Sequence, residues 1–85
     1  MTIKVSYHAQ MRFKQRINAV SHPEFGLLKM WSEGRNATKD DLELFGVKRE
    51  KNKRYRVGRY GQGVGLVILR QYVNEDSWIL TVIPL

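Results

Sequence analysis

The pattern of apolar and polar positions predicts a helical first half of the chain. Apolar side chains at Ile3 and Val5 indicate a short strand, and Ser6 then provides an N-cap for a helix over residues 7–19. Apolar residues recur at helical spacing along this segment and form one buried stripe. The stripe consists of Ala9, Phe13, Ile17 and Val20.

Two further helix starts follow. Residues 21–24, Ser-His-Pro-Glu, have the form of a capping box with proline in the first turn, and the helix that they open ends at Gly34. Apolar side chains nearly encircle this helix, which predicts that it is mostly buried. Residues 38–41, Thr-Lys-Asp-Asp, form a second box, and a short helix or an ordered loop leads from there to Gly46.

The second half of the chain has the alternation and the β-branched content of strands. Residues 54–60 alternate, whereas residues 64–73 and 78–83 are nearly continuous apolar runs, as expected of strands that are buried on both faces. Between them lie the glycine-rich residues 61–63 and the polar residues 74–76. Both connectors are predicted to form hairpin turns.

Together these elements predict an α+β domain. Two or three N-terminal helices pack on a three- to four-stranded antiparallel β-meander, with residues 1–46 mainly helical and residues 47–85 forming the meander. With 42% hydrophobic residues, a chain of 85 residues can build one modest core, so we expect a single domain. Trp78 alternates with Leu80 and Val82, which predicts that its side chain faces this core.

Histidine and arginine recur at every fourth position near the start of the chain. His8, Arg12 and Arg16 therefore share one side of the first predicted helix. A neutral imidazole can accept a proton near pH 7, and a guanidinium can hold a phosphate through two parallel hydrogen bonds. The row is consistent either with a phosphate site or with a solvated helix face whose arginine stems cover the edge of the core.

Basic residues dominate the charge of the chain. Fifteen Lys and Arg against eight Asp and Glu give a net charge of +7 and an isoelectric point near 10.1, which favours a polyanion or an acidic protein as partner. Seven of the basic residues fall in residues 48–59, together with a single acid. Tyr55 and Tyr60 are interleaved with them and are candidates for stacking on bases. The alternative is a solvated hairpin edge with Tyr55 in the core.

Several kinds of site and location are excluded or disfavoured. The chain has no cysteine, which excludes disulfides and thiolate metal sites, and its two histidines lie far in sequence from the clustered carboxylates. We therefore expect no metal and no other cofactor. No apolar stretch approaches the length of a membrane span, and the first twenty residues lack the apolar region of a signal peptide. A cytoplasmic protein that does not enter a membrane is expected.

The order of three short motifs, and of the elements between them, is similar to that of a known family. Residues 8–16 read His-Ala-x-x-Arg-x-x-x-Arg, and a helical middle is followed by Tyr-Arg-Val at residues 55–57, an apolar strand and Thr-Val-Ile-Pro at residues 81–84. This order resembles small RelE-like domains in the superfamily of barnase, EndoU, colicin and RelE-type ribonucleases. The chain departs from the family pattern at residues 18–21, where Asn-Ala-Val-Ser replaces the more usual Arg-Gly-Ile-Ser, and in a longer middle segment.

The resemblance implies helices followed by a twisted antiparallel sheet, and a metal-independent, toxin-like endoribonuclease of plasmid, phage or toxin and antitoxin settings. RNA, such as tRNA or mRNA, would be the substrate, and an acidic antitoxin would be a partner. The family motifs fall on His8, Arg12, Arg16, Arg56 and Thr81. In such a reaction His8 is the candidate base or acid, and Arg12 and Arg56 are candidates for holding the phosphate.

The interface predicted for nucleic acid consists of the basic side of the first predicted helix, the basic residues 48–59 and the predicted central strand. Arg70 and Tyr72 lie on that strand, and strand register decides which of them projects into the cleft. Three functions stay open: a metal-independent ribonuclease, a non-catalytic basic module that binds RNA or DNA, and a small inhibitor or adaptor that docks on an acidic protein or nucleoprotein complex. The binding candidates are Arg16, Lys48, Arg49, Lys51, Lys53, Arg54, Arg59, Tyr60 and Arg70.

Overall fold

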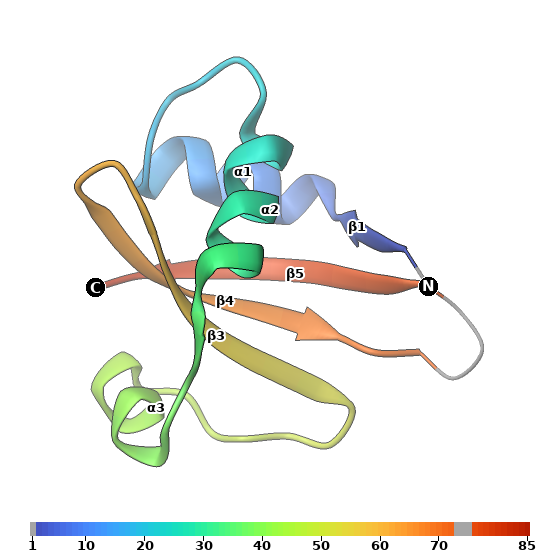
Figure 1. The fold of residues 1–85 in the computed structure, drawn as a ribbon, viewed down its shortest axis with the longest axis vertical. Helices are drawn as coiled ribbons and strands as arrows, with labels where there is room; N and C mark the ends of the chain where they lie inside the picture. Colours follow the sequence, from blue (N-terminus) through green and yellow to red (C-terminus); the bar gives the residue numbers. More distant parts are fainter. Residues whose placement is uncertain (1, 73–75) are drawn as a thin grey trace.

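One five-stranded sheet lies between helices on both of its faces in the computed structural model, which describes residues 2–72 and 76–85 (Figure 1). The fold is of the α+β class, as the sequence predicts. The elements in chain order are β1 (Ile3–Val5), α1 (Tyr7–Arg16), α2 (Pro23–Glu33), β2 (Arg35–Asn36), α3 (Lys39–Phe45), β3 (Lys53–Tyr60), β4 (Gly63–Arg70) and β5 (Ser77–Pro84).

The sheet is mixed, with strands from the helical half of the chain at both edges. Its strands lie in the order β1, β5, β4, β3, β2, and the three central ones form the predicted antiparallel meander. β1 runs parallel to β5, and β2 pairs antiparallel with β3. The predicted meander is therefore present, but the sheet has five strands and not three or four, and the pairing at its β1 edge is parallel. The turn predicted at residues 74–76 falls on a segment that, apart from Asp76, lies outside the described residues.

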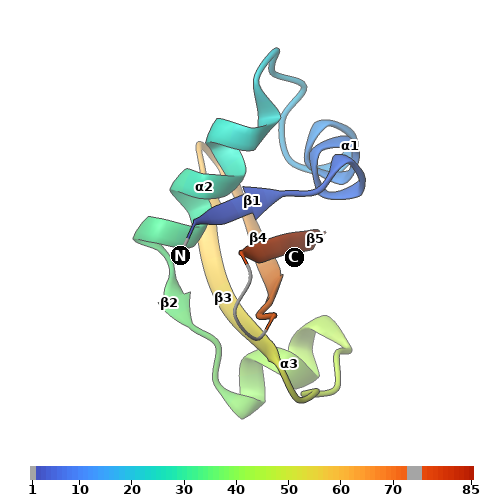
Figure 2. The same ribbon diagram turned by 90° about the vertical axis from the view of Figure 1, so that its right-hand side faces the viewer.

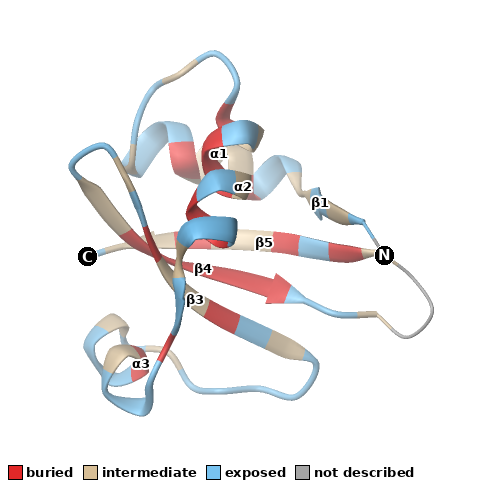
Figure 3. Ribbon diagram, viewed as in Figure 1, coloured by how far each residue is buried: buried red, intermediate tan, exposed pale blue. Residues whose placement is uncertain are grey.

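The helices divide the core into two parts. α1 and α2 cover one face of the sheet, and α3 lies on the other (Figure 2). Because β4 lies between both parts, residues 65–69 are all buried, which explains the continuous apolar run in the sequence (Figure 3). The core under α1 and α2 contains Ala9, Phe13, Leu27, Met30, Trp31, Val67, Leu69, Ile79 and Val82. The core under α3 contains Ala37, Leu42, Tyr55, Leu66 and Ile68.

Two glycines allow α2 to lie directly against its neighbours. A Cβ atom on Gly58 of β3 would overlap the main-chain carbonyl of Met30, and one on Gly26 would overlap the ring of Phe13. The Phe13 ring comes from α1 and is fully buried at this contact. A larger side chain at either glycine would push α2 away from the sheet or from α1.

The predicted caps hold at α1 and α3. Ser6 accepts a hydrogen bond from the Ala9 N–H (3.1 Å) and so caps α1. Thr38 and Asp41 form the predicted capping box at the start of α3. At its end Gly46 adopts the left-handed conformation, with φ +72°, that glycine favours.

Two predicted helix ends are wrong. α1 stops at Arg16, not at residue 19, because the N–H groups of Ile17 and Asn18 both donate to the Phe13 carbonyl and close the helix. The capping box predicted at residues 21–24 does not form. The second helix begins at Pro23, so its N-cap is His22 and not Ser21. The His22 side chain makes no hydrogen bond to the helix.

A β-bulge at Leu80 changes the face on which Trp78 lies. Ile68 on β4 pairs with Thr81, and the next residue of β4 pairs with Ile79, so Leu80 is an extra residue on β5. The bulge breaks the alternation along the strand. Ile79 is fully buried, whereas Trp78 lies on the opposite face with 36% of its surface exposed. The prediction that Trp78 faces the core is therefore wrong.

The bulge also joins β5 to the start of α1. The Ser6 hydroxyl donates to the carbonyl of Leu80 at 3.2 Å, and the Ser6 N–H donates to the carbonyl of Ile79 at 3.1 Å. The same hydroxyl accepts the capping hydrogen bond of α1. One serine therefore caps the helix and fixes its first turn to the last strand.

Replacing each tryptophan should have unequal effects on stability. Trp31 is 6% exposed and lies in the core, so we expect Trp31→Ala to lower the free energy of unfolding by about 3–5 kcal/mol. Trp78→Ala should cost less than half as much, because the side chain already contacts water. Urea denaturation followed by circular dichroism measures both. Equal losses would contradict the register assigned to β5.

An ion pair ties β2 to α3. Arg35 donates to both carboxylate oxygens of Asp41, and the Thr38 N–H donates to one of them at 2.8 Å. These hydrogen bonds, with that from Arg35 the strongest, hold the pKa of Asp41 well below its usual range. A carboxyl with a lowered pKa in the folded state stabilises the fold above its unfolded pKa of about 3.9, and this contribution is lost as the pH falls through the lower, folded pKa.

Acid should therefore lower the thermal midpoint of the protein between about pH 5 and pH 2. Asp41→Asn should reduce the midpoint at pH 7 and should also weaken its dependence on acid, because the titrating group is gone. Asp40→Asn is the control, since Asp40 is exposed in the same helical turn. The same acid dependence in Asp41→Asn as in the parent would disprove this role of the ion pair.

Candidate nucleic-acid interface

His8, Arg12 and Arg16 lie along one side of α1, as their spacing predicts. Arg12 Nε donates a hydrogen bond to His8 Nε2 at 3.4 Å. The contact places the His8 imidazole beside the Arg12 guanidinium. His8 and Arg16 are exposed and Arg12 is half-buried. α1 therefore presents one imidazole and two guanidiniums on an open helix surface.

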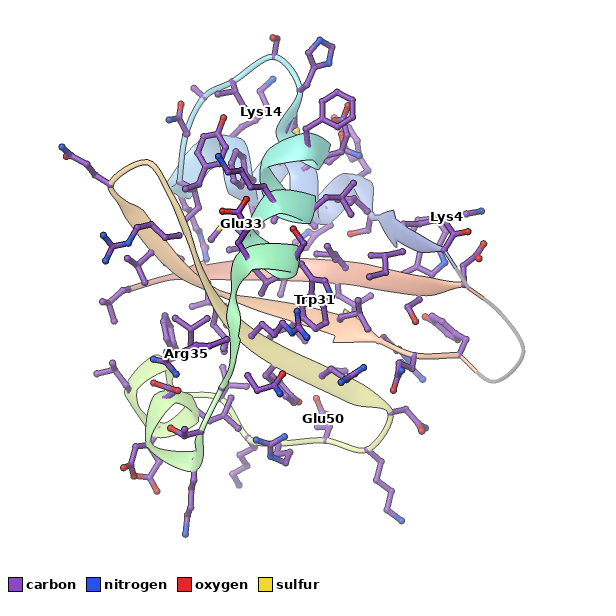
Figure 4. All side chains as sticks on the ribbon, in the orientation of Figure 1. Lys4, Lys14, Trp31, Glu33, Arg35 and Glu50 are labelled. Carbon is purple, nitrogen blue, oxygen red and sulfur yellow. The ribbon has the colours of Figure 1, made fainter. Side chains whose placement is uncertain are left out.

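Arg56 does not join this group. Its Nη1 donates to the carbonyl of Trp31 at 2.8 Å, and its guanidinium lies 4.9 Å from the centre of the Trp31 ring. Its Nε donates to Asn36 Oδ1 at 3.3 Å. Trp31 lies toward the C-terminal end of α2 (Figure 4), so Arg56 joins β3 to that helix and to β2. The structure thus brings His8 and Arg12 together and places Arg56 in a separate set of contacts.

A basic hollow opens beside the outer edge of β3. β2 ends at Asn36, and after the Ala37 N–H has donated to the carbonyl of Tyr55 at 2.9 Å the chain leaves β3 for α3. Because β2 pairs only with residues 56 and 57, it leaves the first residues of β3 without a neighbour on that side. The hollow has a volume of about 330 Å³ and is lined by Asn36, Ala37, Arg49, Lys53, Arg54 and Tyr55.

Three cations surround this hollow, and two of them are oriented by contacts within the protein. Arg49 donates to the carbonyl of Ala37 at 3.3 Å and lies 5.5 Å from the Tyr55 ring centre. Lys53 Nζ donates to Glu50 at 2.6 Å, a hydrogen bond that lowers the pKa of that carboxyl. Arg54 is exposed and has no ion-pair partner within the part of the chain that is described.

Tyr55 supports the loop that carries these cations. It is 4% exposed and belongs to the core under α3, as the alternative interpretation of the sequence has it. Its hydroxyl accepts from the Glu50 N–H at 3.0 Å and donates to the carbonyl of Lys48 at 3.3 Å. It is therefore not available for stacking on a base, and it anchors residues 48–50 against the sheet.

Other predicted binding residues lie elsewhere. Tyr60 is half-buried and packs edge to face on Phe13, with 5.2 Å between the ring centres, so it joins β3 to α1. Arg59 lines a second hollow of about 370 Å³ whose wall includes Glu33, which gives it mixed charge. Lys48 lines a third, more apolar hollow, beside α3.

Two further candidates lie close to the basic hollow in the chain or in the sheet. Lys51 is exposed in the turn before β3. Arg70 is the cross-strand neighbour of Lys53, so its exposed side chain extends the basic surface from the hollow across the sheet. The lining residues that the sequence did not reveal are Asn36 and Ala37, because a strand of two residues shows no periodicity.

The described residues hold neither a candidate metal cluster nor a membrane-spanning helix. Residues 2–72 and 76–85 contain no group of three or more His, Cys, Asp or Glu side chains that could hold a metal ion. Among the helices of this part of the chain, none is long and apolar enough to span a membrane.

Comparison with known proteins identified no relatives. No family model matches the sequence, and neither the curated proteins nor the solved structures include one with significant similarity to it. The geometry of the site is therefore the basis for a functional proposal.

Proposed function

We propose that this protein binds RNA through its phosphate backbone, at the basic hollow formed by Arg49, Lys53 and Arg54. The observation that carries the proposal is the convergence of these three cations on the open edge of β3. A guanidinium can hold a phosphate through two hydrogen bonds, and a lysine adds a compact positive charge. The net charge of +7 would attract a polyanion to this surface from a distance.

Neighbouring contacts prepare the hollow for an anion. Arg56 donates to the side-chain oxygen of Asn36, which leaves the Asn36 amide nitrogen as a donor at the rim of the hollow. Tyr55 and Ala37 fix the position of Arg49, so this guanidinium loses little conformational freedom on binding. An acidic protein such as an antitoxin is the alternative occupant of this surface, and the tests below distinguish it from RNA.

Salt should weaken RNA binding steeply if phosphates occupy the hollow. Replacing Lys53 and Arg54 together with glutamine should reduce affinity and flatten the slope of log K against log salt by about 1.4, or roughly 0.7 per lost contact with a single strand. Fluorescence anisotropy with a labelled RNA at several salt concentrations measures the slope. Matched DNA and polyglutamate probes show whether the ribose or only the negative charge matters.

The matched control removes the same charge elsewhere. Lys14 and Lys29 are exposed on α1 and α2 and do not line the hollow, so their replacement with glutamine should leave the slope unchanged. Equal slopes for the two double variants, or a parent slope near zero, would refute phosphate binding in the hollow. Binding of polyglutamate without binding of RNA would instead favour an acidic protein partner.

A second candidate function, metal-independent RNA cleavage, is favoured by the contact between Arg12 and His8. The imidazole can take a proton from a ribose 2′-hydroxyl once a bound phosphate draws the Arg12 guanidinium away from Nε2 and frees that nitrogen. Arg16 lies one turn further along the same side of the helix. In this proposal Arg56 has a structural role, through its hydrogen bond to the Trp31 carbonyl, and does not bind the phosphate.

Cleavage should be measured on tRNA and mRNA in the presence of EDTA, with a 2′,3′-cyclic phosphate as the expected product, since the reaction uses the substrate's own hydroxyl. His8→Ala should slow it by about 100-fold or more and leave RNA affinity within a few fold. His22→Ala is the control, because the other histidine lies at the start of α2. RNA left intact by the EDTA-treated parent would eliminate the ribonuclease.

A further inference from the structure

A row of four long side chains crosses the sheet on the face that carries α3. Strand register pairs Lys53 with Arg70, Arg70 with Trp78, and Trp78 with Lys4, so the row spans β3, β4, β5 and β1. Cross-strand partners lie on the same face of a sheet. Ile79, next to Trp78, is buried in the core under α1 and α2, which confirms that the row occupies the opposite face.

α3 does not cover this end of the face. Along β4, Leu66 and Ile68 lie in the core under α3, whereas Arg70, the next residue on that face, is exposed. α3 is well separated from the start of β5 (Figure 1), where Trp78 lies. The indole, with 36% of the residue exposed, therefore presents an aromatic surface beyond the part of the sheet that α3 covers.

Cations lie close to the Trp78 ring of the row and to the half-buried ring of Tyr72, which follows β4. Lys4 Nζ lies 5.6 Å from the centre of the Trp78 ring, and the Arg70 guanidinium lies 5.2 Å from that of Tyr72. Carboxylates lie at the two ends. Asp76 pairs with Lys4 at 3.1 Å, and Glu50 pairs with the lysine at the other end (Figure 4 labels Lys4 and Glu50). The central Arg70 lies between these ion pairs.

We infer that this row is a stacking platform for single-stranded nucleic acid, with a base on the Trp78 ring and the backbone passing Arg70 toward Lys53. Lys53 belongs both to the row and to the basic hollow, so one strand can contact the two sites in succession. The inference rests on the proposed RNA binding and specifies the class of ligand. A base inside a duplex is stacked on its neighbours and cannot lie flat on an indole, whereas an unpaired base can.

Charge and shape favour this occupant over a protein helix. Apolar anchors of a helix need a continuous apolar groove, but the neighbours of Trp78 in the row are Arg70 and Lys4. Aromatic rings between cations are the arrangement that holds bases and phosphates together, and it has little sequence preference because every base has a π-face. We therefore expect the platform to select unpaired strands and to tolerate different bases.

The test compares three ligands: an oligouridine of about ten nucleotides, an abasic strand with the same number of phosphates, and the oligouridine annealed to its complement, which has about twice the charge density but no unpaired base. Trp78→Leu should weaken oligouridine binding by about 5-fold or more and should leave abasic binding unchanged. Trp78→Phe keeps a π-face and should retain most of the affinity. Tyr7→Leu is the control, since Tyr7 is an exposed aromatic residue on α1.

Tryptophan emission provides a readout that does not depend on the stability of a variant. Trp31 is buried, so quenching of the parent's emission by oligouridine reports on Trp78. The abasic strand should bind without quenching, and Trp78→Phe should bind oligouridine without the quench. Unchanged affinity in Trp78→Leu, or equal quenching by both strands, overturns the platform and leaves phosphate binding in the hollow intact. Absence of binding to all three ligands overturns both proposals.

Discussion

The close approach of α2 to β3 is the contact on which the rest of the structure depends. Gly58 lets the Met30 backbone rest on the strand, and Gly26 lets the Phe13 ring fill the space between α1 and α2. Because the helix ends against β3, the chain that leaves it at Gly34 runs directly into β2 beside the same strand. The shortness of β2 then leaves the edge of β3 open, and the basic hollow forms there. A packing requirement in the core therefore determines where the charged surface lies.

The sequence was sufficient to predict the elements whose pattern is long. The apolar stripe of α1, the caps at Ser6 and Thr38, and the continuous run that becomes β4 all led to correct elements. It was not sufficient for β2, which is too short to show a period, or for the parallel partner of β1, which depends on contacts distant in sequence. Trp78 was misplaced because a single extra residue on β5 exchanges the two faces of a strand.

The candidate site shows the same division between local and tertiary information. The sequence identified the basic segment from which Arg49, Lys53 and Arg54 come, and the structure gathers these three around one hollow. It did not reveal that the Arg56 guanidinium contacts Trp31, because that contact joins residues far apart in the chain. Tyr55 could not be assigned either, since an alternating strand gives the same pattern whichever of its faces is covered.

The parallel pairing of β1 with β5 has a consequence for how the chain reaches its folded state. The first strand has its sheet partner at the other end of the sequence, and Ser6 makes its contacts with the last strand as well. Pairing β1 with β5 closes a loop of about 70 residues, and the entropy lost in closing it offsets the stability that the pairing contributes. We therefore expect β3 and β4 to form a local hairpin early, and the pairing of β1 with β5 to form late. During synthesis on the ribosome, β5 emerges after the other strands, so the contacts of α1 and Ser6 with β5 can form only after the rest of the sheet is available.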